Sequence, residues 1–262
     1  LHNMTEQHNF NQMIHERDEP ALYIEPRSEQ MAAFAEEAVT VEDQPKVRLH
    51  ADSDEIKDAL YSFLTASKIA ELIHREQLSL RTLTEPVQNT IFTTESEAVV
   101  PVMDKHSISS SDPELVSSVY GEFDSRFEAA EQYHLRTPAL SVVKQTLQEE
   151  IGDDIAAELD EVLAHAEEIS NSNEYLSIVE IMLILAARNE VLFYDVSKWG
   201  EDTGIASKAT FSRAKSALED AGLIETEKVP LDIGRPRLRL IATDELATAN
   251  LKTLSTEIRS SL

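Results

Sequence analysis

The chain has 262 residues, enough for two domains, and its 42% hydrophobic and 27% charged residues are typical of a globular protein. Its formal net charge of −26 argues against a broadly basic nucleic-acid binder or a binder of anionic membranes, but it allows a local basic patch. The absence of cysteine excludes disulfides, thiolate metal sites and a cysteine nucleophile. No apolar run is long enough to cross a membrane, so we expect a soluble cytoplasmic protein.

The excess of acidic residues has two explanations. One is adaptation to a salty cytoplasm, in which surface carboxylates keep a protein hydrated, and the other is an acidic interaction surface. The acids are spread along the chain, and no acidic block reaches five residues. We therefore favour adaptation to salt.

Residues 1–134 alternate between strand and helix patterns, which predicts an α/β domain. Residues 4–17 form only a weak amphipathic pattern. Short apolar runs predict three strands, at residues 21–25, 46–50 and 78–83. Helical patterns separate or follow them, at residues 27–39, 53–64 and 67–75. Ser53 is the expected N-cap of its helix.

The last part of this domain is predicted to contain a hairpin and a long helix. Residues 89–94 and 97–103 are two short β-like runs around a polar turn. Asp112 and Pro113 then begin a helix, with Asp at the N-cap and Pro in the first turn. Its expected apolar stripe is Leu115, Val119, Phe123 and Phe127.

Residues 135–173 are predicted to be a helical connector. Two helices span residues 137–168 and break near Gly152. The polar stretch Ser170–Asn173 is the clearest boundary in the sequence. His165 and Glu168 lie one helical turn apart, which is a possible pair of metal ligands, but a solvated acidic helix face explains them better.

Residues 174–241 follow the order of a winged helix. The nearly continuous apolar run at 176–187 predicts a buried helix. A short helix at 195–203 ends at Gly204, and a third helix at 207–221 has Ser207 at its N-cap. Two β-like runs, at 223–229 and 235–241, flank a turn. The fold class is therefore an α/β N-terminal domain and an α+β winged helix-turn-helix C-terminal domain, joined by helices.

The third helix of this domain has two distinct faces. An inward stripe is expected from Phe211, Ala214, Leu218 and Ala221, which are spaced three and four residues apart. The opposite face carries small, hydroxylated and basic residues, which suit close approach to a major groove. These are Ala209, Ser212, Arg213 and Ser216, with Lys208 and Lys215 on a shared flank. Trp199, in the second helix, is interpreted as a packing residue.

Positive charge is concentrated in the two elements that a winged helix presents to DNA. Residues 207–218 contain three bases and no acid, and residues 228–241 contain four bases and one acid, Asp232. In the second run the arginines alternate with Pro236, Leu238 and Leu240, so the arginines should project from one side of a strand. The predicted DNA-binding residues are Ser207, Lys208, Ala209, Thr210, Ser212, Arg213, Lys215, Ser216, Lys228, Arg235, Arg237 and Arg239.

Several motifs in this region resemble a known family. WGED at 199–202, SKATFSR at 207–213, and EKVP through GRPRLRL at 227–240 are similar to the C-terminal DNA-binding domain of the haloarchaeal TbsP family of transcriptional regulators. SLRTL at 79–83 and LRTPALS at 135–141 resemble connecting segments of the same family. The resemblance implies a sequence-specific DNA-binding regulator with an N-terminal regulatory domain, and it supports the interpretation of the charge as adaptation to salt.

These patterns favour a transcription regulator that binds double-stranded DNA and whose N-terminal domain senses an effector or binds a partner. The alternative is a winged-helix adaptor that binds an acidic protein instead of DNA. No residues have the spacing of a catalytic site, so we expect no enzyme, cofactor or metal. Residues 242–262 are expected to form a helix that covers its own domain or joins a homodimer. The residues with helical spacing there are Ala247, Leu251, Leu254, Ile258 and Leu262.

Overall fold

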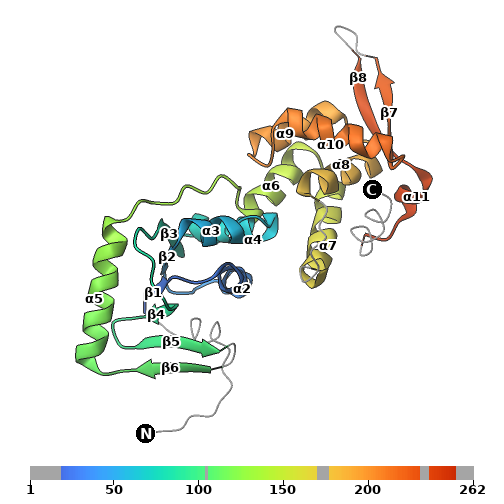
Figure 1. Cartoon of the computed structure of the whole chain (residues 1–262). Coiled ribbons are helices and arrows are strands. Elements are labelled where there is room, and N and C mark those ends of the chain that lie inside the picture. Colours follow the sequence, from blue (N-terminus) through green and yellow to red (C-terminus); the bar gives the residue numbers. More distant parts are fainter. Residues whose placement is uncertain (1–18, 104–105, 170–176, 231–235, 252–262) are drawn as a thin grey trace. The chain divides into compact units, whose positions relative to one another are not determined.

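The computed structural model describes residues 19–103, 106–169, 177–230 and 236–251 (Figure 1). The chain divides into two compact units, Leu1–Ala139 and Leu140–Leu262. Among the described residues, no helix is long and apolar enough to cross a membrane. The amphipathic pattern at residues 4–17 and the polar boundary at 170–173 lie outside the described residues.

The N-terminal unit is built on a six-stranded mixed sheet in the order β3-β2-β1-β4-β5-β6 (Figure 1). Strands β1, β2 and β3 are parallel to one another. Strand β4 pairs antiparallel with β1, β5 with β4, and β6 with β5. The strands are β1 (Ala21–Ile24), β2 (Val47–Ala51), β3 (Leu78–Thr82), β4 (Ile91–Thr93), β5 (Ala98–Met103) and β6 (His106–Ser110).

Helices pack on both faces of this sheet. One face is covered by α2 (Ser28–Ala38), α3 (Ser53–Ala59) and α4 (Phe63–His74), and the other by α5 (Pro113–Ala129). Side chains alternate along a strand, so Tyr23 of β1 packs into the core under the first group, whereas Leu22 and Ile24 pack under α5. This arrangement confirms the predicted α/β domain.

Four details of this unit differ from the sequence predictions. The N-cap of α3 is Asp52, whose carboxylate accepts the Asp54 amide hydrogen at 2.8 Å, and Ser53 is the first helical residue. The helix expected at 53–64 ends at Ala59, because a turn precedes α4. In α5, Leu115 is exposed and Val116 is buried, so the apolar stripe begins one residue later. Strand β6 was not predicted, because its sequence, HSISS, has only one large apolar residue.

The C-terminal unit contains the predicted winged helix-turn-helix order. Helices α8, α9 and α10 precede an antiparallel hairpin of β7 and β8. Gly152, Gly204 and Gly222 have positive φ angles at the ends of α6, α9 and α10. The elements are α6 (Leu140–Glu150), α7 (Asp153–Ile169), α8 (Ile178–Arg188), α9 (Phe193–Asp202), α10 (Lys208–Asp220), β7 (Ile224–Val229), β8 (Arg237–Ala242) and α11 (Asp244–Thr248).

The core of this unit surrounds α8, in which nine residues are buried. Trp199 of α9 is also buried, and its indole N–H donates to the Thr146 hydroxyl of α6 at 3.0 Å. The helix predicted to run through Ala247 and Leu251 is shorter than expected, because α11 ends at Thr248. Leu246 of α11 is buried, whereas Ala247 is exposed. Leu254, Ile258 and Leu262 lie outside the described residues.

Candidate nucleic-acid interface

Helix α10 presents the exposed face that its sequence predicts. Its N-cap is Ser207, whose hydroxyl accepts the Thr210 amide hydrogen at 3.3 Å. Phe211 and Leu218 are fully buried, and this fixes the orientation of the helix. The opposite side is exposed and contains Ala209, Ser212, Arg213 and Ser216. The structure therefore brings four predicted DNA-binding residues together on one face.

The packing of α10 against α9 depends on Gly200, which was not among the predicted site residues. A Cβ atom built on Gly200 of α9 would lie 2.3 Å from the ring of Phe211. Gly200 therefore allows the two helices to approach closely at the point where α10 is anchored. The available signal was the glycine within the predicted helix at 195–203, a position where glycine is otherwise unfavourable.

Arg213 lies at the centre of the exposed face of α10. Its guanidinium makes two long hydrogen bonds to its own helix, each at 3.4 Å, with the Ala209 carbonyl and the Thr210 hydroxyl. Within the described part of the chain it has no carboxylate partner. Its donors can therefore turn toward a ligand without breaking an ion pair.

The two lysines of α10 have different environments. The Lys208 ammonium pairs with Glu201 of α9 at 2.7 Å. This hydrogen bond raises the pKa of Lys208 and lowers the pKa of Glu201. Lys215 is buried, pairs with Glu219 at 2.5 Å and lies over the ring of Phe193. The expected shared flank of the two lysines is wrong, because Lys215 follows Phe211 by four residues and so turns inward with it.

The hairpin arginines also face carboxylates. Arg237 contacts Asp195 of α9 at 3.2 Å, and its guanidinium lies 4.4 Å from the ring centroid of Tyr194. Arg239 lies 3.8 Å from both Glu190 and Glu227. Asp232 is the only acid within residues 228–241, but folding brings further acids from neighbouring elements to these arginines. Leu240 is buried and Lys228 is exposed, whereas Arg235 lies outside the described residues.

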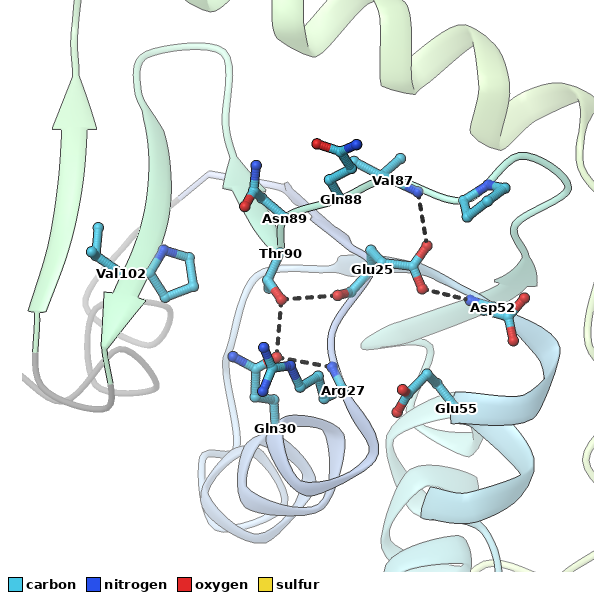
Figure 2. A pocket seen from close by; sticks show the side chains of 12 residues that line it. Glu25, Arg27, Gln30, Asp52, Glu55, Val87, Gln88, Asn89, Thr90 and Val102 are labelled. Atoms are coloured by element: carbon cyan, nitrogen blue, oxygen red, sulfur yellow. Dashed lines mark hydrogen bonds between the residues drawn. The ribbon is translucent and has the colours of Figure 1, made fainter.

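A pocket of about 550 Å³ lies in the N-terminal unit, at the carboxyl ends of β1 and β2 (Figure 2). The first residues of α2 and α3 border the same space. Most of its lining is polar, with three carboxylates and one guanidinium. The lining residues are Glu25, Arg27, Gln30, Asp52, Glu55, Pro86, Val87, Gln88, Asn89, Thr90, Pro101 and Val102.

Hydrogen bonds connect the segments that form this pocket. The Glu25 carboxylate accepts from the Asp52 amide at 3.2 Å and from the Val87 amide at 3.3 Å (Figure 2). The Thr90 hydroxyl donates to the Glu25 carbonyl at 2.9 Å, and the Glu55 carboxylate accepts from the Ser28 amide at 2.7 Å. These acids already occupy backbone donors that could otherwise bind an anion, so the pocket does not favour a phosphate.

The described residues contain no group of three or more His, Cys, Asp or Glu that could hold a metal ion. His165 instead uses its Nδ1 atom in a 2.8 Å hydrogen bond with the Glu161 carbonyl. The side chain of Glu168 lies outside the part that can be described.

Family comparisons divide the chain at the boundary between the two units. Residues 1–138 match the N-terminal domain of TbsP-like transcriptional regulators, and residues 139–259 match their C-terminal HTH domain. The chain belongs to the TbsP-like transcriptional regulators. This confirms the resemblance found in the sequence motifs, and it places α6 to α11, with the β7–β8 hairpin, within the C-terminal HTH domain of a transcriptional regulator.

Among solved structures, the chain is similar to TrmBL2, an archaeal chromatin protein whose structure is described as showing a novel mode of DNA binding. The sequence identity is 17% and the TM-score is 0.37, over 47% of this chain and 48% of TrmBL2. The similarity thus spans about half the length of that protein. A search of curated proteins finds no match.

Proposed function

We propose that this TbsP-like regulator binds specific DNA sequences through α10 and the β7–β8 hairpin. The observation that carries the proposal is the exposed face of α10, where Arg213 stands between Ser212 and Ser216 without an acidic partner among the described residues. An Arg guanidinium can donate two hydrogen bonds to the O6 and N7 atoms of guanine in the major groove. Small neighbouring side chains allow the helix to approach the base edges.

The remaining basic side chains are proposed to contact the phosphate backbone of DNA. Lys208, Lys228, Arg237 and Arg239 are at least partly exposed on α10 and the hairpin. Phosphate contacts fix the orientation of a protein on DNA without reading its sequence. The hydroxyls of Ser207 and Thr210 lie at the N-terminus of α10, and such side chains also contact phosphate oxygens. Lys215 is assigned a structural role, since the residue is buried and its ammonium pairs with Glu219.

Selection of bound duplexes from a random-sequence DNA library tests the proposed specificity. The full chain should enrich a common motif, and that motif should compete for binding far better than mixed-sequence DNA at the same salt concentration. If no motif is enriched and no duplex is bound, the DNA-binding proposal is refuted. The alternative is then an adaptor in which the hairpin arginines bind an acidic protein, which their carboxylate contacts in this structure would suit.

We further propose that the N-terminal unit senses a small effector in the pocket beside Glu25. Support comes from its position, because ligands of α/β proteins bind beyond the carboxyl ends of parallel strands. Its mixed donors and acceptors suit a polar molecule that carries both kinds of group. Thermal unfolding in the presence of a set of polar metabolites should reveal a ligand that raises the melting temperature.

Asn89 offers a clean variant for that screen. It lines the pocket, is exposed and makes no hydrogen bond within the described part of the chain. Asn89→Ala should leave the melting temperature of the free protein unchanged and reduce the shift caused by the ligand. An undiminished shift would place the effector elsewhere.

We also propose that the chain acts as a homodimer, because DNA half-sites are usually read by symmetric pairs of HTH domains. Sedimentation equilibrium of the full chain should then give twice the mass of 29.3 kDa. A monomer mass both with and without DNA would contradict this.

A further inference from the structure

Most of the basic side chains that are proposed to contact DNA phosphates form ion pairs with acidic side chains in this structure. Glu201 pairs with Lys208, Asp195 with Arg237, and Glu227 and Glu190 with Arg239. These contacts join α9 to α10, α9 to β8, β7 to β8, and the segment between α8 and α9 to β8. Within the described residues of α10 and the hairpin, only Arg213 and Lys228 have no carboxylate partner. Acidic and basic side chains therefore share the surface that is proposed to contact DNA.

These ion pairs are exposed enough to exchange partners. The side chains of Lys208 and Glu201 are 46% and 43% exposed, and those of Arg237 and Asp195 are 37% and 41% exposed. Exposed pairs of this kind contribute little to stability, so a phosphate can take the place of the carboxylate. The displaced carboxylate then lies close to a phosphate of the same sign. In the absence of a cation, that repulsion opposes binding.

We propose that this interface takes up monovalent cations when it binds DNA. DNA phosphates replace Glu201, Asp195 and Glu227 as partners of Lys208, Arg237 and Arg239. Cations from solution then neutralise the carboxylates that are released. The inference rests on the proposed function, because it requires that these bases meet the DNA backbone. It adds a second ligand, a monovalent cation shared between a protein carboxylate and a phosphate.

Cation uptake changes how binding depends on salt. Each phosphate contact normally releases condensed cations and contributes about −0.9 to the slope of log K against log salt concentration. Each cation taken up by the protein contributes about one unit of opposite sign, by the same linkage. Cation release from DNA and cation uptake by the protein therefore nearly cancel wherever a basic side chain leaves a carboxylate to contact a phosphate. The wild-type slope should therefore be much shallower than the number of phosphate contacts predicts.

The test uses the full chain and a fluorescently labelled DNA duplex of mixed sequence. Binding is measured by anisotropy across a potassium chloride series, for the wild type and for a variant that combines Glu201→Gln, Asp195→Asn and Glu227→Gln. The variant should bind more tightly at low salt, and its slope should be more negative by about three units, about one for each carboxylate removed. Circular dichroism and thermal unfolding verify its fold. If the triple variant does not fold, Glu201→Gln alone should steepen the slope by about one unit.

Asp160→Asn is the matched control. Asp160 belongs to the same unit and pairs with Lys144 at 2.7 Å, but this pair joins α6 to α7 and involves no residue of α9, α10 or the hairpin. Asp160→Asn removes one carboxylate charge, as Glu201→Gln does, but it removes it away from α10 and the hairpin, so the slope should stay unchanged. A slope shift equal to that of Glu201→Gln would show a general charge effect and would overturn the inference.

Exchange of potassium for tetramethylammonium provides a second measurement. This bulky cation fits poorly between a carboxylate and a phosphate, so the wild-type slope should become steeper, whereas the triple variant should respond much less. Equal slopes for wild type and variant, with tight binding by both, would refute cation uptake and leave the proposed function intact. A wild type that binds no duplex at any salt concentration would refute the proposed function and this inference with it.

Discussion

Helices α5 and α10 are both charged and amphipathic, yet they use their charges in opposite ways. On α5, Asp124 and Glu128 turn toward the sheet and meet Arg48 of β2, which also donates to the Tyr120 hydroxyl at 2.7 Å. On α10, Arg213 turns away from its unit and meets no carboxylate among the described residues. Asp124 and Glu128 of α5 thus take part in the fold, whereas the central charge of α10 is available to a ligand.

The ends of the two helices show the same contrast. Arg81 of β3 donates to the Phe127 carbonyl at 2.6 Å and to the Glu128 carbonyl at 2.9 Å, at the C-terminus of α5. A cation there satisfies unpaired carbonyls and complements the helix dipole. At the N-terminus of α10, the structure places Ser207 and the exchangeable Lys208–Glu201 pair. Substitutions in α5 should therefore change stability, and substitutions on the exposed face of α10 should change DNA binding.

The largest effect is expected from Gly200→Ala, which disturbs the packing of α10 against α9. The added methyl group would overlap the ring of Phe211, which is fully buried. Overpacking of this severity costs about 3 kcal/mol, and α10 must shift to relieve it. The free energy of unfolding from a urea titration should fall by about that amount, and DNA affinity should fall with it. Unchanged stability would show that α9 and α10 do not pack this closely.

Arg213→Ala should separate binding from stability. The side chain is exposed and has only weak contacts with its own helix, so the melting temperature should stay the same. Loss of a bidentate contact to guanine costs about 1–3 kcal/mol, which is roughly a 5- to 150-fold loss of affinity for the selected motif. Arg213→Lys keeps the charge but not the planar fork, so it should retain binding to mixed DNA while losing sequence preference. Full affinity in Arg213→Ala would place base recognition elsewhere.

Arg48→Met tests the ion pairs beneath α5, as Arg213→Ala tests the exposed face of α10. Methionine keeps most of the apolar stem but removes the ion pairs with Asp124 and Glu128 and the contact with Tyr120. Arg48 is only 17% exposed, but its acidic partners are more open to water, so we expect a loss of about 1–2 kcal/mol in unfolding free energy. DNA affinity should not change.

Arg126→Met is the control for Arg48→Met. Arg126 pairs with Glu122 on the surface of α5 at 2.8 Å, and exposed pairs of this type contribute less than about 1 kcal/mol. If both variants lose equal stability, the Arg48 cluster is no more important to the fold than a surface pair.

The C-terminal unit was largely predictable because its signals are local. Helical spacing and the N-cap at Ser207 predicted the extent of α10, and the position of Phe211 predicted the face that carries Arg213. The same spacing was ambiguous for Lys215, which lies at the margin between the two faces and turns inward. The acids beside Arg237 and Arg239 could not be foreseen, because Asp195 and Glu190 reach them only through tertiary folding.

In the N-terminal unit, the strands with large apolar residues were predictable and the polar parts were not. Strand β6 is recognisable only from its pairing with β5, since its own sequence lacks alternation. The pocket draws Glu25, Asp52 and Thr90 from three separate segments, none of which carries a motif. Similarly, Arg48 appears in the sequence as an ordinary strand residue, and its role depends on an acid 76 positions away.

Gly121→Ala is expected to have the smallest effect and the opposite sign. Gly121 lies within α5 and is exposed, and a Cβ atom there would meet nothing within 4 Å. Alanine restricts the unfolded chain and favours the helix by about 1 kcal/mol relative to glycine. The variant should therefore unfold at a higher urea concentration, with unchanged DNA affinity, in contrast to Gly200→Ala. A loss of stability would mean that another surface covers this side of α5, and a matching change in the sedimentation mass would identify that surface as a second copy of the chain.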